Sequence, residues 1–166
     1  VQPAMVKIGT PLADVDGAFN AVMADVGEAG PYFFEGRGAG AAPTASAVVA
    51  DIVDVARGAN GPCFGVPAAE LSALTPALPD SRRAAFYLRF AVLDMPGVLA
   101  EIAGRLAESG VSIESMIQRG RSPGEPVAIV MITHESPEPA AARALKVIAA
   151  SDKVLGNPCM IPMETG

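Results

Sequence analysis

The chain has 166 residues, 51% hydrophobic and 18% charged, so it predicts one ordinary domain or two small ones and excludes a wholly disordered chain. Twelve Lys and Arg against eighteen Asp and Glu give a net charge of −6. A chain of this charge lacks the basic stripe that binds a phosphate backbone, and no apolar run approaches the ~20 residues of a membrane-spanning helix. We therefore expect neither a nucleic-acid nor a membrane partner.

The two cysteines, Cys63 and Cys159, belong to no CxxC or metal-ligand pattern, which is typical of a reducing compartment. We expect a cytoplasmic protein without a metal site. The first residue is Val1, and the opening VQPAMVKIG lacks the charged and apolar regions of a signal peptide. This start suggests a portion of a longer chain.

Short extended runs dominate residues 1–57. AMVKI (4–8) is followed by FNAVMADV (19–26) and PYFFEG (31–36), and glycines at 27 and 30 separate the last two runs. The pattern predicts a hairpin and one further strand. With fewer than 60 residues, this first module has little independent core and is expected to complete a sheet whose other strands lie elsewhere.

A helix is predicted over 43–56. Val48, Ile52 and Val55 recur at helical spacing, Pro43 lies near the first helical position, and Gly58 follows the end. The proline- and glycine-rich stretch 58–83 then breaks both helical and strand periodicity, which indicates a linker.

In the second module, residues 84–164, stretches with the hydrophobic periodicity of a strand alternate with stretches that have the periodicity of a helix. We predict strands over 84–94, 111–120, 126–134 and 153–163, and helices over 96–110 and 138–150. The third strand is apolar on both faces, as a central strand should be, and the prolines of the last strand favour a sheet edge. The order βαββαβ predicts a ferredoxin-like sandwich, and the whole chain is expected to be α+β.

GRGAG (36–40) runs directly into the predicted helix 43–56. Glycines allow a backbone to approach a ligand closely, and a helix N-terminus offers unpaired N–H groups to an anion or a polar cofactor edge. The same pattern is also that of a tight strand-to-helix turn that needs glycine for backbone reasons alone. Spacing does not separate these two interpretations.

The amino-acid sequence of residues 11–58 carries a second, more specific signal than this spacing. PLADVDGAFNAV and YFFEGRGAGAAPTASAVVADIVDVARG resemble the C-terminal end of the catalytic region of homoserine dehydrogenase, which carries GxGAG followed by PTAxAVxxD. The resemblance implies an NAD(P)-dependent oxidoreductase that interconverts aspartate semialdehyde and homoserine in the threonine, methionine and isoleucine pathway. It places Gly38, Gly40 and Thr44 near the cofactor, NADP or NAD, with the preference between them left open.

In that family the Rossmann domain and the catalytic lysine precede the matching segment. Lys7 lies in a strand-like run outside the family's catalytic motif, so we assign it to solvent and name no catalytic residue. The resemblance therefore implies that the 166-residue chain alone lacks dehydrogenase activity, since hydride transfer requires the whole cofactor to be held against the substrate.

A second candidate site is LDMPGVLAEIA (93–103), where the Pro-Gly at the end of a strand exposes backbone N–H groups at the start of a helix. A carboxylate could bind there, and a well-formed turn gives the same pattern. D-x-PGVL-x-x-I in a βαββαβ frame resembles the ACT domain, a small amino-acid-sensing module. The resemblance implies an effector, with threonine favoured, and a homodimer or higher homo-oligomer. The implied effector-binding residues are Asp94, Met95, Pro96, Gly97 and Val98.

Two other functions stay open: a free-standing amino-acid-binding regulator and a purely structural dimerisation module. The GRGAG segment argues against the first, because a sensor has no use for a cofactor-facing turn. His134 and Cys159 are expected to be a solvent-facing or structural residue and a small buried residue, respectively. Arg119 and Arg121, in the loop 118–126, are either solvated or face an anionic ligand, and we favour the solvated placement.

Overall fold

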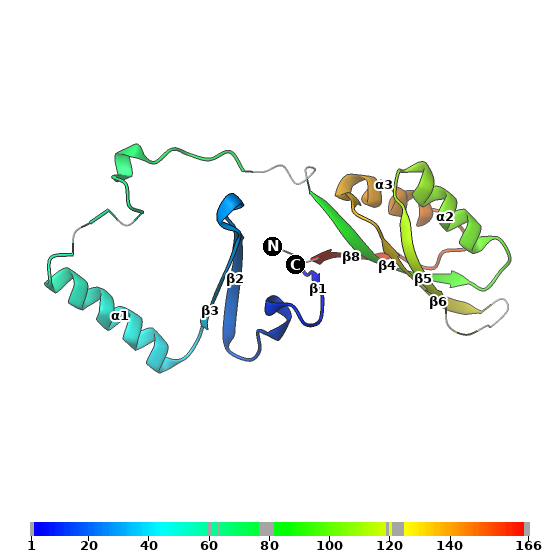
Figure 1. The fold of residues 1–166 in the computed structure, drawn as a ribbon. Coiled ribbons are helices and arrows are strands. Elements are labelled where there is room, and N and C mark those ends of the chain that lie inside the picture. The colour runs from blue at the N-terminus through cyan, green and yellow to red at the C-terminus, as the bar shows by residue number, and fades with distance from the viewer. Residues whose placement is uncertain are drawn as a thin grey trace. The chain divides into compact units, whose positions relative to one another are not determined.

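The structure is a computed structural model that describes residues 2–59, 61–62, 64–76, 82–118, 120 and 125–164. Its contacts divide the chain into two compact units (Figure 1). One, the ferredoxin-like unit, comprises Val1–Lys7 and Ala77–Gly166. The other, the hairpin–helix unit, comprises Ile8–Pro76.

The hairpin–helix unit contains the predicted hairpin and helix. Strands β2 (Phe19–Asp25) and β3 (Pro31–Arg37) pair antiparallel from Phe19↔Arg37 to Asp25↔Pro31. Helix α1 (Ala41–Ala56) begins two residues before its predicted start. Pro43 is tolerated in this first turn because its N–H would have no partner there. Among its described residues the unit also has 3-10 helices at Pro11–Asp14, Gly27–Ala29 and Ala68–Glu70.

Apolar side chains of this unit lie largely in solvent. Helix α1 has no buried residue, although Val48, Ile52 and Val55 follow the helical period. The stacked rings of Tyr32 and Phe34 on the hairpin are exposed as well. The described residues of this unit therefore form secondary structure without a closed core of their own.

The ferredoxin-like unit has the predicted βαββαβ order, which confirms the α+β class. Two short strands lie beyond that order: β1 (Met5–Val6), and β7 (Ser136–Pro137), which pairs with the start of β4. The six elements of the βαββαβ order are β4 (Arg83–Leu93), α2 (Val98–Glu108), β5 (Ile113–Gln118), β6 (Pro126–Thr133), α3 (Glu138–Ile148) and β8 (Cys159–Glu164).

The core of this unit lies between the sheet and its two helices, which cover one face of the sheet (Figure 1). Alternate residues of β4, among them Phe86, Leu88 and Phe90, are buried because successive strand residues point to opposite faces. Helix α2 supplies Val98, Ile102 and Leu106, four residues apart on one face. This unit therefore has the closed core that the hairpin–helix unit lacks.

The position of β8 differs from the expectation. The strand order is β1-β8-β4-β6-β5, so β8 is not an edge strand, whereas β6 is central as predicted. Strand β1 (Met5–Val6), expected to lie with the hairpin, pairs in parallel with β8 through Met5↔Met163 and Val6↔Glu164. The prolines of the last strand suggested an edge, but a distant segment occupies that edge.

Strand β5 departs from simple alternation. Its register to β6 shifts between Ile113 and Ser115, where the ladder has a bulge. One extra residue sends the following side chains to the opposite face of the sheet. Ile113 and Ile117, which the sequence places on one face, therefore lie on opposite faces, and Ile117 is exposed.

Candidate functional sites

The glycine-rich turn joins β3 to α1. Gly40 is the N-cap residue of α1 with φ 130°, a conformation that favours glycine. Its carbonyl accepts hydrogen bonds from the backbone N–H of Thr44 at 3.2 Å and from the Thr44 hydroxyl at 2.8 Å. Thr44 thus closes the first turn of the helix and fixes the carbonyl of Gly40.

Gly38 has a different reason to be glycine. Its φ lies outside the left-handed region, so a residue with a side chain could adopt its backbone conformation. A Cβ at Gly38 would instead overlap Asn20 Nδ2 and lie 2.8 Å from Asn20 Cγ. Gly38 N–H donates to the carbonyl of Ala18 at 3.0 Å, which holds the turn against the residue directly before β2. Sequence reasoning missed Asn20, although a polar residue inside the apolar run FNAVMADV was a signal.

The donors at this turn fit a polar or anionic group. No side chain caps α1, and the structure shows no hydrogen bond from the backbone N–H groups of Ala41 and Ala42 within the part of the chain it describes. These groups lie at the positive end of a 16-residue helix. The turn and its glycines are exposed. A nucleotide edge or phosphate is the chemistry that such a donor set can hold.

The second candidate site, residues 94–98, connects β4 to α2. The N–H of Asp94 donates to Glu125 O at 3.1 Å, that of Met95 to Leu93 O at 2.9 Å, and that of Val98 to Met95 O at 3.4 Å, so three of the loop's amides are engaged. Gly97, with φ 89°, is the N-cap residue, and its carbonyl accepts from the N–H of Glu101 at 2.9 Å. The loop is thereby fixed at both ends.

Several groups of this loop are exposed or show no hydrogen bond within the part of the chain that the structure describes. Met95, Pro96 and Gly97 are exposed, and no side chain caps α2. Among the described residues, no hydrogen bond from the N–H groups of Gly97 and Leu99 is seen. Val98 is 3% exposed and packs in the core, and its N–H donates to Met95 O at 3.4 Å, so this residue does not face a ligand. The loop can hold a small carboxylate through amides at the start of a helix.

An ion pair ties the first turn of α2 to the segment before β8. Lys153 Nζ donates to Glu101 Oε2 at 3.0 Å, and this hydrogen bond is the main cause that lowers the pKa of the Glu101 carboxyl. The carbonyl of Lys153 also accepts from the N–H of Leu93 at 3.0 Å. Both ends of the candidate loop are therefore braced by residue 153.

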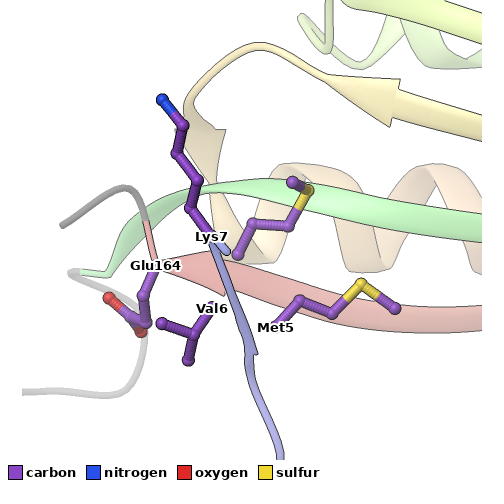
Figure 2. Close-up of a pocket in the computed structure, with 5 residues that line it drawn as sticks. Met5, Val6, Lys7 and Glu164 are labelled. Atoms are coloured by element: carbon purple, nitrogen blue, oxygen red, sulfur yellow. The ribbon is translucent and has the colours of Figure 1, made fainter. Parts of the chain in front are cut away.

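A recess of about 300 Å³ lies at the edge where β1 meets β8 (Figure 2). Met5, Val6 and Met163 give it an apolar lining, and Lys7 and Glu164 complete it. Figure 2 shows the Lys7 and Glu164 side chains extending away from each other. The recess brings together none of the residues predicted from the sequence, and Lys7 is exposed directly after β1.

The remaining sequence candidates lie outside both sites. His134 is exposed directly after β6, in agreement with a solvent-facing placement, and Cys159 is half-buried in β8 rather than fully buried. Cys63, Arg119 and Arg121 lie outside the described residues. Within the described ranges, no group of three or more His, Cys, Asp or Glu side chains gathers in a metal-binding arrangement. No helix there is long and apolar enough to span a membrane.

Parts of both units match known families. Residues 86–150, which lie within the ferredoxin-like unit, match the family model of the ACT domain. Residues 1–53 match the family model of homoserine dehydrogenase. The chain is therefore similar, in both parts and in their order, to the C-terminal portion of homoserine dehydrogenases, and the resemblance seen in the sequence is confirmed.

Curated relatives support the same assignment. The chain is 39% identical over 171 residues to the homoserine dehydrogenase of Neisseria gonorrhoeae, covering 99% of this chain and 39% of that protein. The enzyme of Pseudomonas aeruginosa is 37% identical over 171 residues, with the same two coverages. The chain thus spans about two fifths of the length of the curated relatives that it matches.

Solved structures agree. The crystal structure of a homoserine dehydrogenase from Thiobacillus denitrificans superposes with a TM-score of 0.83 at 39% identity, covering 98% of this chain and 38% of that one. The homoserine dehydrogenase of S. aureus at pH 7.0 gives a TM-score of 0.54 at 21% identity over 97% of this chain and 36% of that one. The second likeness supports the fold.

Proposed function

We propose that this chain is the C-terminal portion of an NAD(P)-dependent homoserine dehydrogenase, which interconverts L-aspartate 4-semialdehyde and L-homoserine. The observation that carries the proposal is similarity along 99% of the chain to a homoserine dehydrogenase, together with an exposed glycine-rich turn at the N-terminus of α1. On this proposal the enzyme is cytoplasmic and serves threonine, methionine and isoleucine biosynthesis. In this proposal, residues 1–57 are the C-terminal end of the catalytic domain, residues 58–83 are a linker, and residues 84–164 form the ACT domain.

In this assignment the chain contributes one part of the cofactor site. A bound nicotinamide nucleotide supplies the hydride chemistry. Gly40 gives it a surface without a side chain, Gly38 leaves its own side-chain position to the Asn20 carboxamide, and Thr44 keeps the Gly40 carbonyl engaged in the helix, leaving the N–H groups of Ala41 and Ala42 for a polar group. The described residues supply binding and orientation, and the proton-transferring groups belong to the rest of the enzyme.

The test compares the full-length enzyme with the 166-residue chain. We expect full-length protein to reduce NADP or NAD with L-homoserine, and we expect no measurable turnover from the chain alone, because α1 and the hairpin here form part of a site. The formation of reduced nicotinamide is the readout, and circular dichroism controls for folding of the chain. An inactive full-length protein contradicts the assigned reaction, whereas turnover by the isolated chain contradicts the division of the site.

The second half of the proposal concerns regulation. We infer that the loop 94–98 binds the carboxylate of a small amino acid, with L-threonine as the effector. The support is the set of exposed residues Met95–Gly97, the unbonded N–H groups at the start of α2 and the ACT family match. A purely structural module is the competing assignment, and the titration below separates the two.

Threonine is expected to raise the unfolding temperature of the chain. At a hundredfold excess over Kd, mass action adds about 2.7 kcal/mol to the stability of the binding unit. Gly97→Asp should abolish the shift, because it places a carboxylate beside the ligand's own. Gly110→Asp is the matched control: Gly110 has φ 75° and an equally open Cβ position, but it lies at the far end of α2. Thermal scans with threonine, isoleucine and methionine measure the effect.

No shift at millimolar threonine contradicts the effector assignment and favours the structural module. An equal shift in Gly97→Asp contradicts the assigned loop, while a shift lost in both variants attributes the loss to backbone strain. A larger shift with isoleucine or methionine identifies a different effector at the same loop.

We also propose a homodimer formed through the sheet. Strand β1 covers the outer edge of β8, and no described strand pairs with the outer edge of β5. Unpaired N–H and C=O groups along such an edge favour pairing with a second copy. Met116 and Ile117 on this strand are exposed. Sedimentation equilibrium of the chain measures its mass directly.

A further inference from the structure

Asn20 lies on a face of the hairpin that two glycines leave open. In the register of β2 and β3, Asn20 is directly opposite Gly36, and Gly38 is its diagonal neighbour two residues further along. Side chains at 36 and 38 would share the face of Asn20, since strand residues alternate between faces. Because neither glycine has a side chain, the Asn20 side chain can extend toward either position.

The Asn20 side chain leans toward Gly38. A Cβ at Gly36 would meet no atom within 4 Å, whereas a Cβ at Gly38 would overlap Asn20 Nδ2, lie 2.8 Å from Cγ and lie 3.5 Å from Oδ1. The carboxamide therefore occupies the space that a side chain at position 38 would fill. Gly38 itself lies three residues before the first residue of α1, Ala41.

Internal structure does not account for this placement. The Asn20 carboxamide is exposed, and the described part of the chain shows no hydrogen bond to it. The hairpin end is already held by the bond from Gly38 N–H to Ala18 O and by the Arg37 guanidinium, 5.0 Å from the centre of the Phe19 ring. Gly38 does not need to be glycine for its backbone conformation.

We propose that Asn20 is a positioning residue of the cofactor-binding turn, and that position 38 is glycine in order to admit the Asn20 carboxamide. The inference rests on the proposed function, because the ligand of the turn is the nicotinamide nucleotide assigned above. Asn20 sets the shape and polarity of the surface that Gly38 offers to that ligand. Gly40, in contrast, is glycine for its backbone conformation.

A double-mutant cycle in the full-length enzyme tests the pair. We expect Asn20→Ala to raise the Kd of NADP or NAD about tenfold, while the KM for homoserine and the unfolding temperature stay at their wild-type values. Gly38→Ala should raise the Kd by a similar factor, because the new Cβ displaces the carboxamide. The double variant should bind no more weakly than either single variant, since both changes remove the same interaction. Asn157→Ala, an exposed asparagine in the other unit, is the matched control.

Each of the other possible results contradicts one specific part of the proposal. An unchanged Kd in Asn20→Ala removes Asn20 from the site, and additive losses show that Gly38 makes room for the ligand and not for Asn20. A lowered unfolding temperature, or a KM for homoserine that rises in parallel, assigns Asn20 to general structure. A wild-type enzyme that binds neither nucleotide overturns the proposed function itself. In the 166-residue chain, an NMR contact between the Asn20 side-chain amide and the Gly38 Hα checks the packing without any cofactor.

Discussion

Replacing Phe86 with alanine is expected to lower the free energy of unfolding of the ferredoxin-like unit by about 3–5 kcal/mol. Phe86 is 0% exposed in the middle of the sheet and is among the largest fully buried side chains of the core. Its removal forfeits the transfer of an aromatic ring from water and leaves a cavity between β4 and the helices. A small domain has a total stability of only about 5–15 kcal/mol, so the loss is a large share of it.

Urea titration followed by hydrogen exchange of residues 83–93 measures this loss in the unit that contains Phe86. Phe64→Ala is the matched control, because Phe64 is 77% exposed and lies in the other unit, so the same chemical change should leave the exchange of β4 unaltered. A Phe86→Ala protein with wild-type exchange in β4 would mean that this strand does not carry the core.

Thr133→Val is expected to lower the free energy of unfolding of the same unit by about 1–3 kcal/mol. Thr133 is 0% exposed, and its hydroxyl oxygen accepts a hydrogen bond from the N–H of Phe86 at 3.0 Å. Strand β4 pairs with β7 at residues 83–84 and with β6 from residue 87 onward. The Thr133 side chain therefore accepts from a backbone N–H in the gap between two ladders, and valine of similar shape would leave that donor buried without a partner.

The exchange rate of the Phe86 amide, read by NMR, distinguishes this cause from general loosening. In Thr133→Val that amide should exchange faster than its neighbours in β4. Thr133→Ser keeps the hydroxyl and should preserve the protection of Phe86, at the cost of about one buried methyl group, near 0.8 kcal/mol. Equal protection of Phe86 in the valine and wild-type proteins would exclude the proposed role of the hydroxyl.

The elements of the ferredoxin-like unit were predictable because each has a strong local period. Alternate burial along β4 and the spacing of Val98, Ile102 and Leu106 on α2 follow from the same geometry that the sequence pattern expresses. The same spacing also indicated that the Val98 side chain faces the core, even though the ACT resemblance included this residue in the ligand loop. At residue 98 the periodicity correctly predicts a buried side chain, and the Val98 N–H donates to Met95 O at 3.4 Å.

The features that escaped prediction depend on pairings between distant segments. Prolines in β8 are compatible with an edge, and nothing local to residues 153–163 indicates that residues 5–6 cover that edge. The bulge in β5 depends on its register to β6, which a single strand does not encode. The contact between Asn20 and Gly38 likewise requires the hairpin register, because the two residues are diagonal neighbours across β2 and β3.

The pairing of β1 with β8 also has a consequence for the order of folding. Met5 and Met163 lie near opposite ends of the sequence, so their contact closes a loop of almost the whole chain, and the entropy lost in closure grows with loop length. Two residue pairs offer few hydrogen bonds in return. The βαββαβ frame, whose contacts are more local, is therefore expected to form first, and β1 is expected to join it last.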